Sequence, residues 1–106
     1  MPQYVVIGSH EPSQCPGANR VMGEVFKKLL EAAPRIAEQH GVRVVMGPVH
    51  LDPSHKFLVV LEAPTQDAVQ DALLANRIGQ VQAVELYRAT PVPDLLAKTQ
   101  GQEPLY

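Results

Sequence analysis

The residues with the greatest potential for chemistry lie in one short segment and one later turn. The segment Ser9–Asn19 holds His10 and the only cysteine of the chain, Cys15, and the later turn holds His50 and His55. Imidazole nitrogens and thiolate sulfur are good ligands for borderline and soft transition metals. These residues therefore predict a site for zinc, copper or iron, with His50 as the weakest of the four candidates.

Other interpretations of the same residues stay open. The four residues between His10 and Cys15 match no strong metal signature, and the chain has no CxxC or HExxH motif. His50 and His55 could be turn histidines that point to water. Cys15 precedes a predicted helix N-terminus, which lowers the pKa of a thiol, so it could be a nucleophile with His10 as its base. Cys15 could also be a small buried hydrophobic side chain.

Carboxylates on the predicted sheet are a further set of candidates. A carboxylate such as Glu62 inside an apolar barrel would have a raised pKa and could act as a general base. The competing interpretation places Glu62 and Glu85 at strand ends or at the rim of a dimer, solvated or paired with Arg43 or Arg88. The candidate catalytic residues are His10, Cys15 and Glu62.

The elements that must position these residues follow the order β-α-β-β-α-β. Short apolar, β-branched runs predict strands at residues 4–8, 42–47, 57–62 and 81–88. Apolar residues at i, i+3, i+4 and i+7 predict helices at about 18–40 and 66–78. Pro34 predicts a kink or break in the first helix, and Gly41 and Gly79 are expected to end the two helices.

This order predicts an α+β fold of the ferredoxin-like, split-βαβ kind. Right-handed crossovers place both helices on one face of a four-stranded antiparallel sheet with the strand order 4-1-3-2. In that topology the ends of the first and second strands and the start of the third share one edge of the sheet. His10, Cys15, His50 and His55 are therefore expected to meet at that edge.

The strands are apolar on both faces, which predicts a partner for the face without helices. An exposed apolar face of several hundred Å² is not tolerated in a monomer, so two sheets are expected to pack face to face. By element order, length and two-faced strands, residues 3–90 resemble the dimeric α+β barrel superfamily, which includes small monooxygenases, muconolactone-isomerase-like enzymes and GYD-type domains. The resemblance implies a homodimer with an inner cavity. It assigns no catalytic residue, because no family motif is matched.

Length and charge narrow the remaining choices. The 106 residues predict one barrel domain at 1–90 and a tail at 91–106 that is either loose or packed on the partner subunit. Nine basic and 11 acidic residues give a formal net charge of −2, which argues against a nucleic-acid groove. No apolar run approaches the ~20 residues that span a bilayer. No signal peptide is visible, so the cytoplasm is the expected compartment.

Three functions follow from these patterns. The first is a dimeric metal-binding domain with His10, Cys15 and His55 as ligands. The second is a cofactor-independent enzyme, monooxygenase- or isomerase-like, that acts on a small molecule in a cavity near His10. The third is a non-catalytic ligand-binding module.

Overall fold

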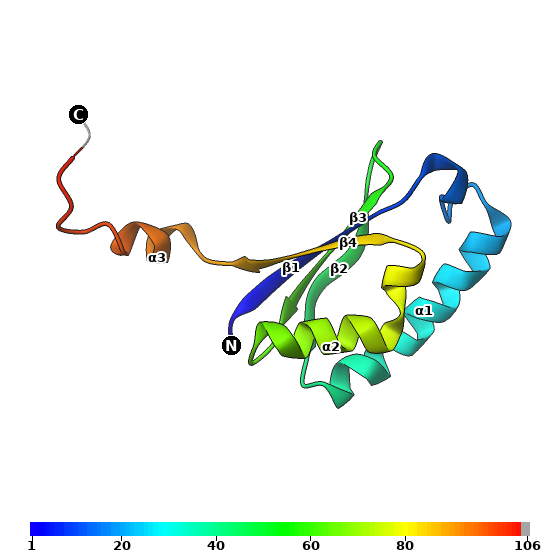
Figure 1. Ribbon diagram of the computed structural model, residues 1–106, viewed down its shortest axis with the longest axis horizontal. Coiled ribbons are helices and arrows are strands. Elements are labelled where there is room, and N and C mark those ends of the chain that lie inside the picture. Colours follow the sequence, from blue (N-terminus) through cyan, green and yellow to red (C-terminus); the bar gives the residue numbers. More distant parts are fainter. Residues whose placement is uncertain (105–106) are drawn as a thin grey trace.

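Four strands form one sheet in the order β2-β3-β1-β4, and every neighbouring pair is antiparallel (Figure 1). The structure is a computed structural model, and it describes residues 1–104. The strands are β1 (Gln3–Ser9), β2 (Arg43–Leu51), β3 (Lys56–Glu62) and β4 (Ala83–Ala89). The predicted strand order is confirmed, and the fold is ferredoxin-like.

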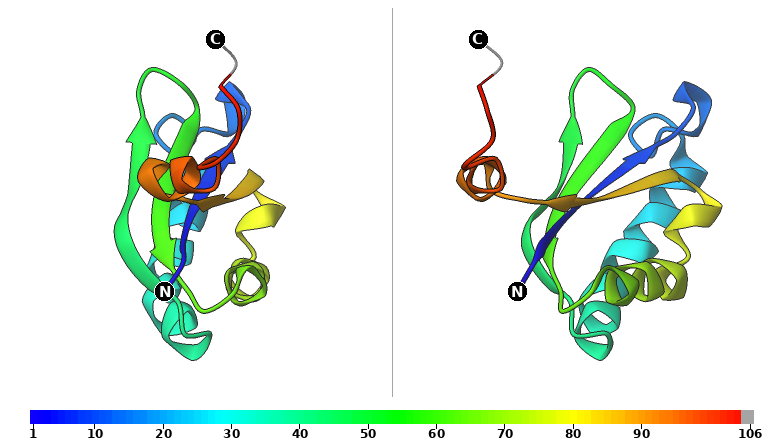
Figure 2. Two further views of the ribbon diagram at one scale, coloured as in Figure 1. Left: turned by 90° about the vertical axis from the view of Figure 1, so that its left-hand side faces the viewer. Right: turned by 60° about the vertical axis from the view of Figure 1, so that its left-hand side comes forward.

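Two helices cover one face of this sheet, as the right-hand view of Figure 2 shows. They are α1 (Arg20–Gln39) and α2 (Gln66–Asn76), and the short helix α3 (Val92–Ala97) follows β4. Side-chain oxygens cap both long helices: Asn19 accepts from the backbone N–H of Met22, and Thr65 accepts from that of Ala68. Among residues 1–104, no helix combines the length and apolar character needed to span a bilayer.

The core lies between the helices and the sheet. Alternate residues of β1 face it, so Tyr4 and Val6 are 3% and 0% exposed. Val59 and Leu61 of β3 stand beside them in register, and Val69 of α2 is fully buried against this layer. Burial of this one side of the sheet fixes the register, because a slip by one residue would turn every apolar side chain to the wrong face.

The opposite side of the sheet, here called the open face, is covered by none of the helices in the described part of the chain (Figure 2). The strand register places one row of apolar side chains across it at Met46, Val60, Val5 and Tyr87. A second row follows the same direction. Its members are Val49, Leu58, Ile7 and Glu85.

The second strand is longer than the sequence indicates. The prediction ended it at Gly47 and placed a turn from residue 48, but β2 continues to Leu51. Gly47 has φ +93, a conformation that suits glycine, and register shifts against β3 lie on both sides of Met46. Because β2 is an edge strand, Pro48 removes no hydrogen bond that a central strand would need.

The boundaries of the helices also differ from the prediction. Helix α1 does not break at Pro34. A proline at this position leaves the Leu30 carbonyl without its helical hydrogen bond, but Pro34 and Leu30 are both exposed, so water can take the place of the missing partner. Helix α2 ends at Asn76 and not near Ile78, because Arg77 adopts a left-handed conformation with φ 66. A 3₁₀ turn over Ile78–Gln80 then leads into β4.

Gly8 is needed where β1 passes beneath the ring of Phe57. A Cβ at this position would lie 1.9 Å from a ring carbon of Phe57. We therefore expect Gly8→Ala to lower the free energy of unfolding by about 1–3 kcal/mol through overpacking, measured by urea denaturation. Gly79→Ala is the matched control, because a Cβ at Gly79 meets nothing within 4 Å. Equal unfolding free energies for the two variants would contradict this account.

Candidate metal centre

The register of β1 against β3 brings two of the histidines together. Ser9 pairs with Lys56 at the end of the β1–β3 ladder. The next residue beyond each strand end is His10 on one side and His55 on the other, so these two residues lie opposite each other. The backbone N–H of His10 donates to the His55 carbonyl at 3.1 Å, which extends the ladder by one bond. The two imidazole rings lie edge to face, with centroids 5.5 Å apart.

A compact turn returns the chain so that Cys15 lies against this pair. The 3₁₀ turn Pro12–Gln14 ends with the Cys15 N–H donating to the carbonyl of Pro12 at 3.2 Å. The Cys15 carbonyl in turn accepts from Ala18 and Asn19 at 3.0 and 2.7 Å. Backbone hydrogen bonds on both sides hold Cys15 just ahead of α1, and the residue is 9% exposed.

These three side chains form the one group of potential metal-ligating His, Cys, Asp and Glu residues that the structure shows within residues 1–104. One nitrogen of His10, one of His55 and the Cys15 sulfur all lie within 4.8 Å of one another. Metal bonds of about 2.0 Å to nitrogen and 2.3 Å to sulfur would place tetrahedral donors roughly 3.5 Å apart. The longest separation must therefore close by about 1 Å around an ion.

Two of the ring nitrogens have no hydrogen-bond partner. His10 Nε2 and His55 Nδ1 are both buried from solvent, and neither meets a donor or acceptor. An unsatisfied buried polar group costs about 1–3 kcal/mol, so native structures rarely keep one without a role. Two such nitrogens beside a buried thiol are the arrangement that a bound cation would satisfy.

Gln82 orients the His10 ring. Its carbonyl oxygen Oε1 lies 3.0 Å from His10 Nδ1, so the ring donates from Nδ1 and Nε2 carries the lone pair. Gln82 is 5% exposed and follows the 3₁₀ turn that precedes β4, where its N–H donates to Ile78. A hydrogen bond that fixes the second nitrogen is the usual support of a metal-ligating histidine.

His50 does not join the group. It lies within β2 opposite Phe57, is exposed, and its Nδ1 pairs with the Asp52 carboxylate at 2.6 Å. The longer β2 explains this position, because His50 belongs to the strand and not to the turn that carries His55.

Glu62 lies on the open face at the far end of β3. It forms an ion pair of 2.7 Å with Arg43, as one of the two sequence interpretations proposed. The hydrogen bonds from the Arg43 guanidinium hold the pKa of Glu62 below its ordinary value. The raised pKa that a general base at this position would need is therefore not found.

The other carboxylate of the open face, Glu85, has a different partner. It accepts a hydrogen bond from the Tyr87 hydroxyl, and this bond raises the pKa of Tyr87. Both carboxylates of this face therefore have a side-chain partner within the chain.

The geometry gives less support to a thiol nucleophile than to a metal site. No hydrogen bond joins the Cys15 thiol to either imidazole in the described part of the chain, although a nucleophile and its base are expected to make one. A cleft does run beside His10, lined by Ser9, His10, Glu11, Gln14, Met22 and residues 79–83. The two nitrogens of His10 are bonded to Gln82 or buried, so neither offers the cleft a free lone pair.

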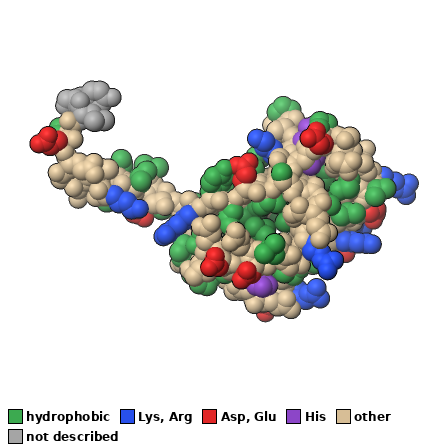
Figure 3. Space-filling view, viewed as in Figure 1, with side chains coloured by type: hydrophobic (Ala, Val, Ile, Leu, Met, Phe, Trp, Pro, Cys, Tyr) green, Lys and Arg blue, Asp and Glu red, His purple; other side chains and the backbone are tan. Residues whose placement is uncertain are grey.

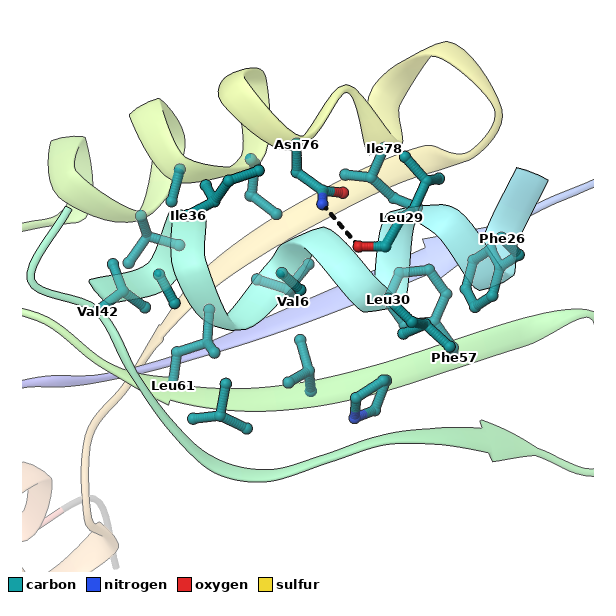
Figure 4. Close-up of a pocket in the computed structure, with 18 residues that line it drawn as sticks. Val6, Phe26, Leu29, Leu30, Ile36, Val42, Phe57, Leu61, Asn76 and Ile78 are labelled. Atoms are coloured by element: carbon teal, nitrogen blue, oxygen red, sulfur yellow. Dashed lines mark hydrogen bonds between the residues drawn. The ribbon is translucent and has the colours of Figure 1, made fainter. Parts of the chain in front are cut away.

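A second, apolar cavity of about 130 Å³ lies between the helices and the sheet (Figure 4). Val6, Phe26, Leu30 and Phe57 are among its lining residues, and Asn76 is the only polar side chain among them. Asn76 donates to the Leu29 carbonyl at 3.1 Å and so links α2 to α1. With no titratable group in its wall, this cavity can hold an apolar molecule but cannot transfer protons.

Comparisons with known proteins add the following. No protein-family model matches the sequence, and no curated protein matches it. A solved structure, described as a dimeric ferredoxin-like protein from an uncultured marine organism, is similar over 86% of this chain and 93% of that chain. The sequence identity is 15% and the TM-score is 0.41.

The role of Gln82 leads to a test of the centre. We expect Gln82→Leu to weaken zinc binding about 10–100-fold, measured by competition with a chromophoric chelator, because the His10 ring loses its fixed orientation. Gln82→Glu should retain binding, since a carboxylate also accepts from Nδ1. If the glutamate variant lost as much zinc affinity as the leucine variant, the hydrogen bond that residue 82 accepts from His10 Nδ1 would not be the cause of tight binding.

Proposed function

We propose that the chain is a metal-binding domain in which His10 Nε2, His55 Nδ1 and Cys15 Sγ hold one transition-metal ion. Two observations support this proposal: one ring nitrogen of each histidine and the buried Cys15 sulfur lie within 4.8 Å of one another, and each ring has a buried nitrogen without a hydrogen-bond partner. Zinc, copper and iron all accept this donor set. In the cytoplasm, the compartment expected from the sequence, the thiol would stay reduced and free to ligate.

Three protein donors leave one coordination position for an outside ligand. Structural zinc sites are closed by four protein ligands, whereas catalytic ones keep a position for water or substrate. Among residues 1–104 the group contains no fourth His, Cys, Asp or Glu. The cleft lined in part by His10 is the solvent-filled space beside this group, although the proposed ligand nitrogen of His10 is buried from it. This donor count favours an exchangeable site over a purely structural one.

Metal analysis of untagged protein tests this function. After loading with Zn²⁺ or Co²⁺ and desalting, we expect about one ion per chain, and the cobalt form should show a thiolate-to-cobalt charge-transfer band. His10→Ala, Cys15→Ser and His55→Ala should each lower the affinity at least 100-fold, since each removes one of three ligands.

His50→Ala is the matched control, because His50 is exposed and paired with Asp52 outside the centre. Circular dichroism spectra of all variants would establish that they remain folded. Binding that survives removal of all three ligands, or wild-type protein that retains no ion, would refute the metal-binding proposal.

The apolar cavity favours a second function, the binding of a small apolar molecule without chemistry. A cavity of about 150 Å³ lined by aliphatic and aromatic side chains can hold benzene, and this one is of similar size. Indole or benzene should therefore raise the melting temperature in a saturable way, measured by calorimetry. Ala72→Leu, which extends a side chain into the cavity, should abolish that shift. An equal shift in both proteins would place the binding elsewhere.

We also propose that the chain forms a homodimer by packing two open faces together. Met46, Val49 and Tyr87 of this face are 44%, 41% and 52% exposed, and Val5, Ile7, Leu58 and Val60 lie between them. Apolar side chains in adjoining rows form a continuous patch, which soluble proteins normally cover. The Arg43–Glu62 pair lies at one end of the patch and would form part of the polar rim.

A further inference from the structure

The segment after β4 stands away from the rest of the chain. Every residue from Thr90 to Pro104 is exposed, and Figures 1 and 3 show α3 as an arm beyond the end of the sheet. Val92, Leu95 and Leu96 of this arm are 61%, 52% and 60% exposed. The predicted tail covers residues 91–106, of which Leu105 and Tyr106 lie outside the described residues.

A helix of this kind needs a surface to pack on. Isolated helices shorter than ~12–15 residues are marginal in water, and α3 has six residues. Helices so short form in proteins because tertiary contacts hold them. Within residues 1–104 no such contact buries any side chain of the arm.

The arm is directed away from its own sheet. Pro91 has φ −55 and ψ 136, an extended conformation that continues the direction of β4. Proline fixes φ near this value, so Pro91 restricts the conformations of the link between β4 and α3. The longest dimension of the chain, 56 Å against 33 Å and 19 Å, reflects this extension.

The area of the open face explains why a second copy would use the arm. Four strands about 4.8 Å apart, with seven residues rising about 3.3 Å each, cover roughly 400–450 Å². A stable interface buries about 800 Å² on each partner, so the sheet alone supplies roughly half of that. The same chain carries an apolar arm that its own fold leaves bare, and in a symmetric pair two arms would be buried at once.

We infer that α3 docks on the second copy of this chain, and that Leu95 and Leu96 anchor it along the partner's edge strand β2, at the border of the two packed open faces. This inference rests on the homodimer proposed above and names the element that completes it. The sheets align the two copies, and the exchanged arms supply the remaining apolar area. The arm follows Ala89, which pairs with Gln3 at the end of the sheet away from His10, so the proposed docking and metal binding use different ends of the sheet.

Sedimentation equilibrium of the full-length protein over a concentration series tests this inference. We expect the wild-type protein to be a dimer. The double variant Leu95→Glu/Leu96→Glu should raise the dissociation constant of the dimer at least 100-fold. Gln100→Glu/Gln102→Glu is the matched control, because it adds the same two charges to the arm beyond the helix and should leave the dimer intact.

A photo-crosslinking residue at position 96 gives an independent measurement. Mass spectrometry of the product should show intermolecular bonds to peptides of β2 or β3. The zinc content of the wild-type protein and of both arm variants should be equal. A failure of the metal-binding proposal would appear in this measurement and not in the dimer dissociation constants. A monomeric wild-type protein would overturn both the dimer and the arm. A dimer that the Leu95→Glu/Leu96→Glu change leaves equally stable, or crosslinks only within one chain, would overturn the arm alone.

Discussion

The antiparallel register between β1 and β3 is the constraint on which the rest of this structure depends. It is set by burial, because Tyr4 and Val6 must face the helices together with Leu61 and Val59. That same register, continued by one residue pair past the ladder, brings His10 opposite His55. The candidate centre is therefore a direct consequence of how the core packs, and no separate device is needed to bring the two rings together.

The neighbourhood of this pair is held by small local features. Gly8 lies two residues before His10 and leaves room for the ring of Phe57, which lies two residues after His55. The 3₁₀ turn and the hydrogen bonds to the Cys15 carbonyl fix where the chain enters α1. Gln82 arrives from the far end of the sequence and holds one imidazole by its second nitrogen. Local backbone hydrogen bonds and one long-range side-chain contact together determine the donor positions.

The sequence alone was sufficient for the strand order and for the meeting of His10, Cys15 and His55, because both follow from element order and right-handed crossovers. It was not sufficient for the end of β2, since Pro48 normally signals a turn and only an edge position with a left-handed Gly47 permits the strand to continue. Because β2 continues to Leu51, His50 lies in this strand and apart from the other two histidines of the predicted site. Gln82 could not have been found, because a lone amide 72 residues from its partner carries no pattern.

The antiparallel pairing of β1 with β4 has one more consequence. It places Ser9 beside Ala83 at one end of the sheet and Gln3 beside Ala89 at the other. The potential ligands cluster beyond the first end, and the C-terminal extension departs from the second. Substitutions that alter the proposed self-association would therefore leave the proposed ligand atoms in place, and the reverse is also true. Such a layout would allow the two proposed properties to evolve independently on one small scaffold.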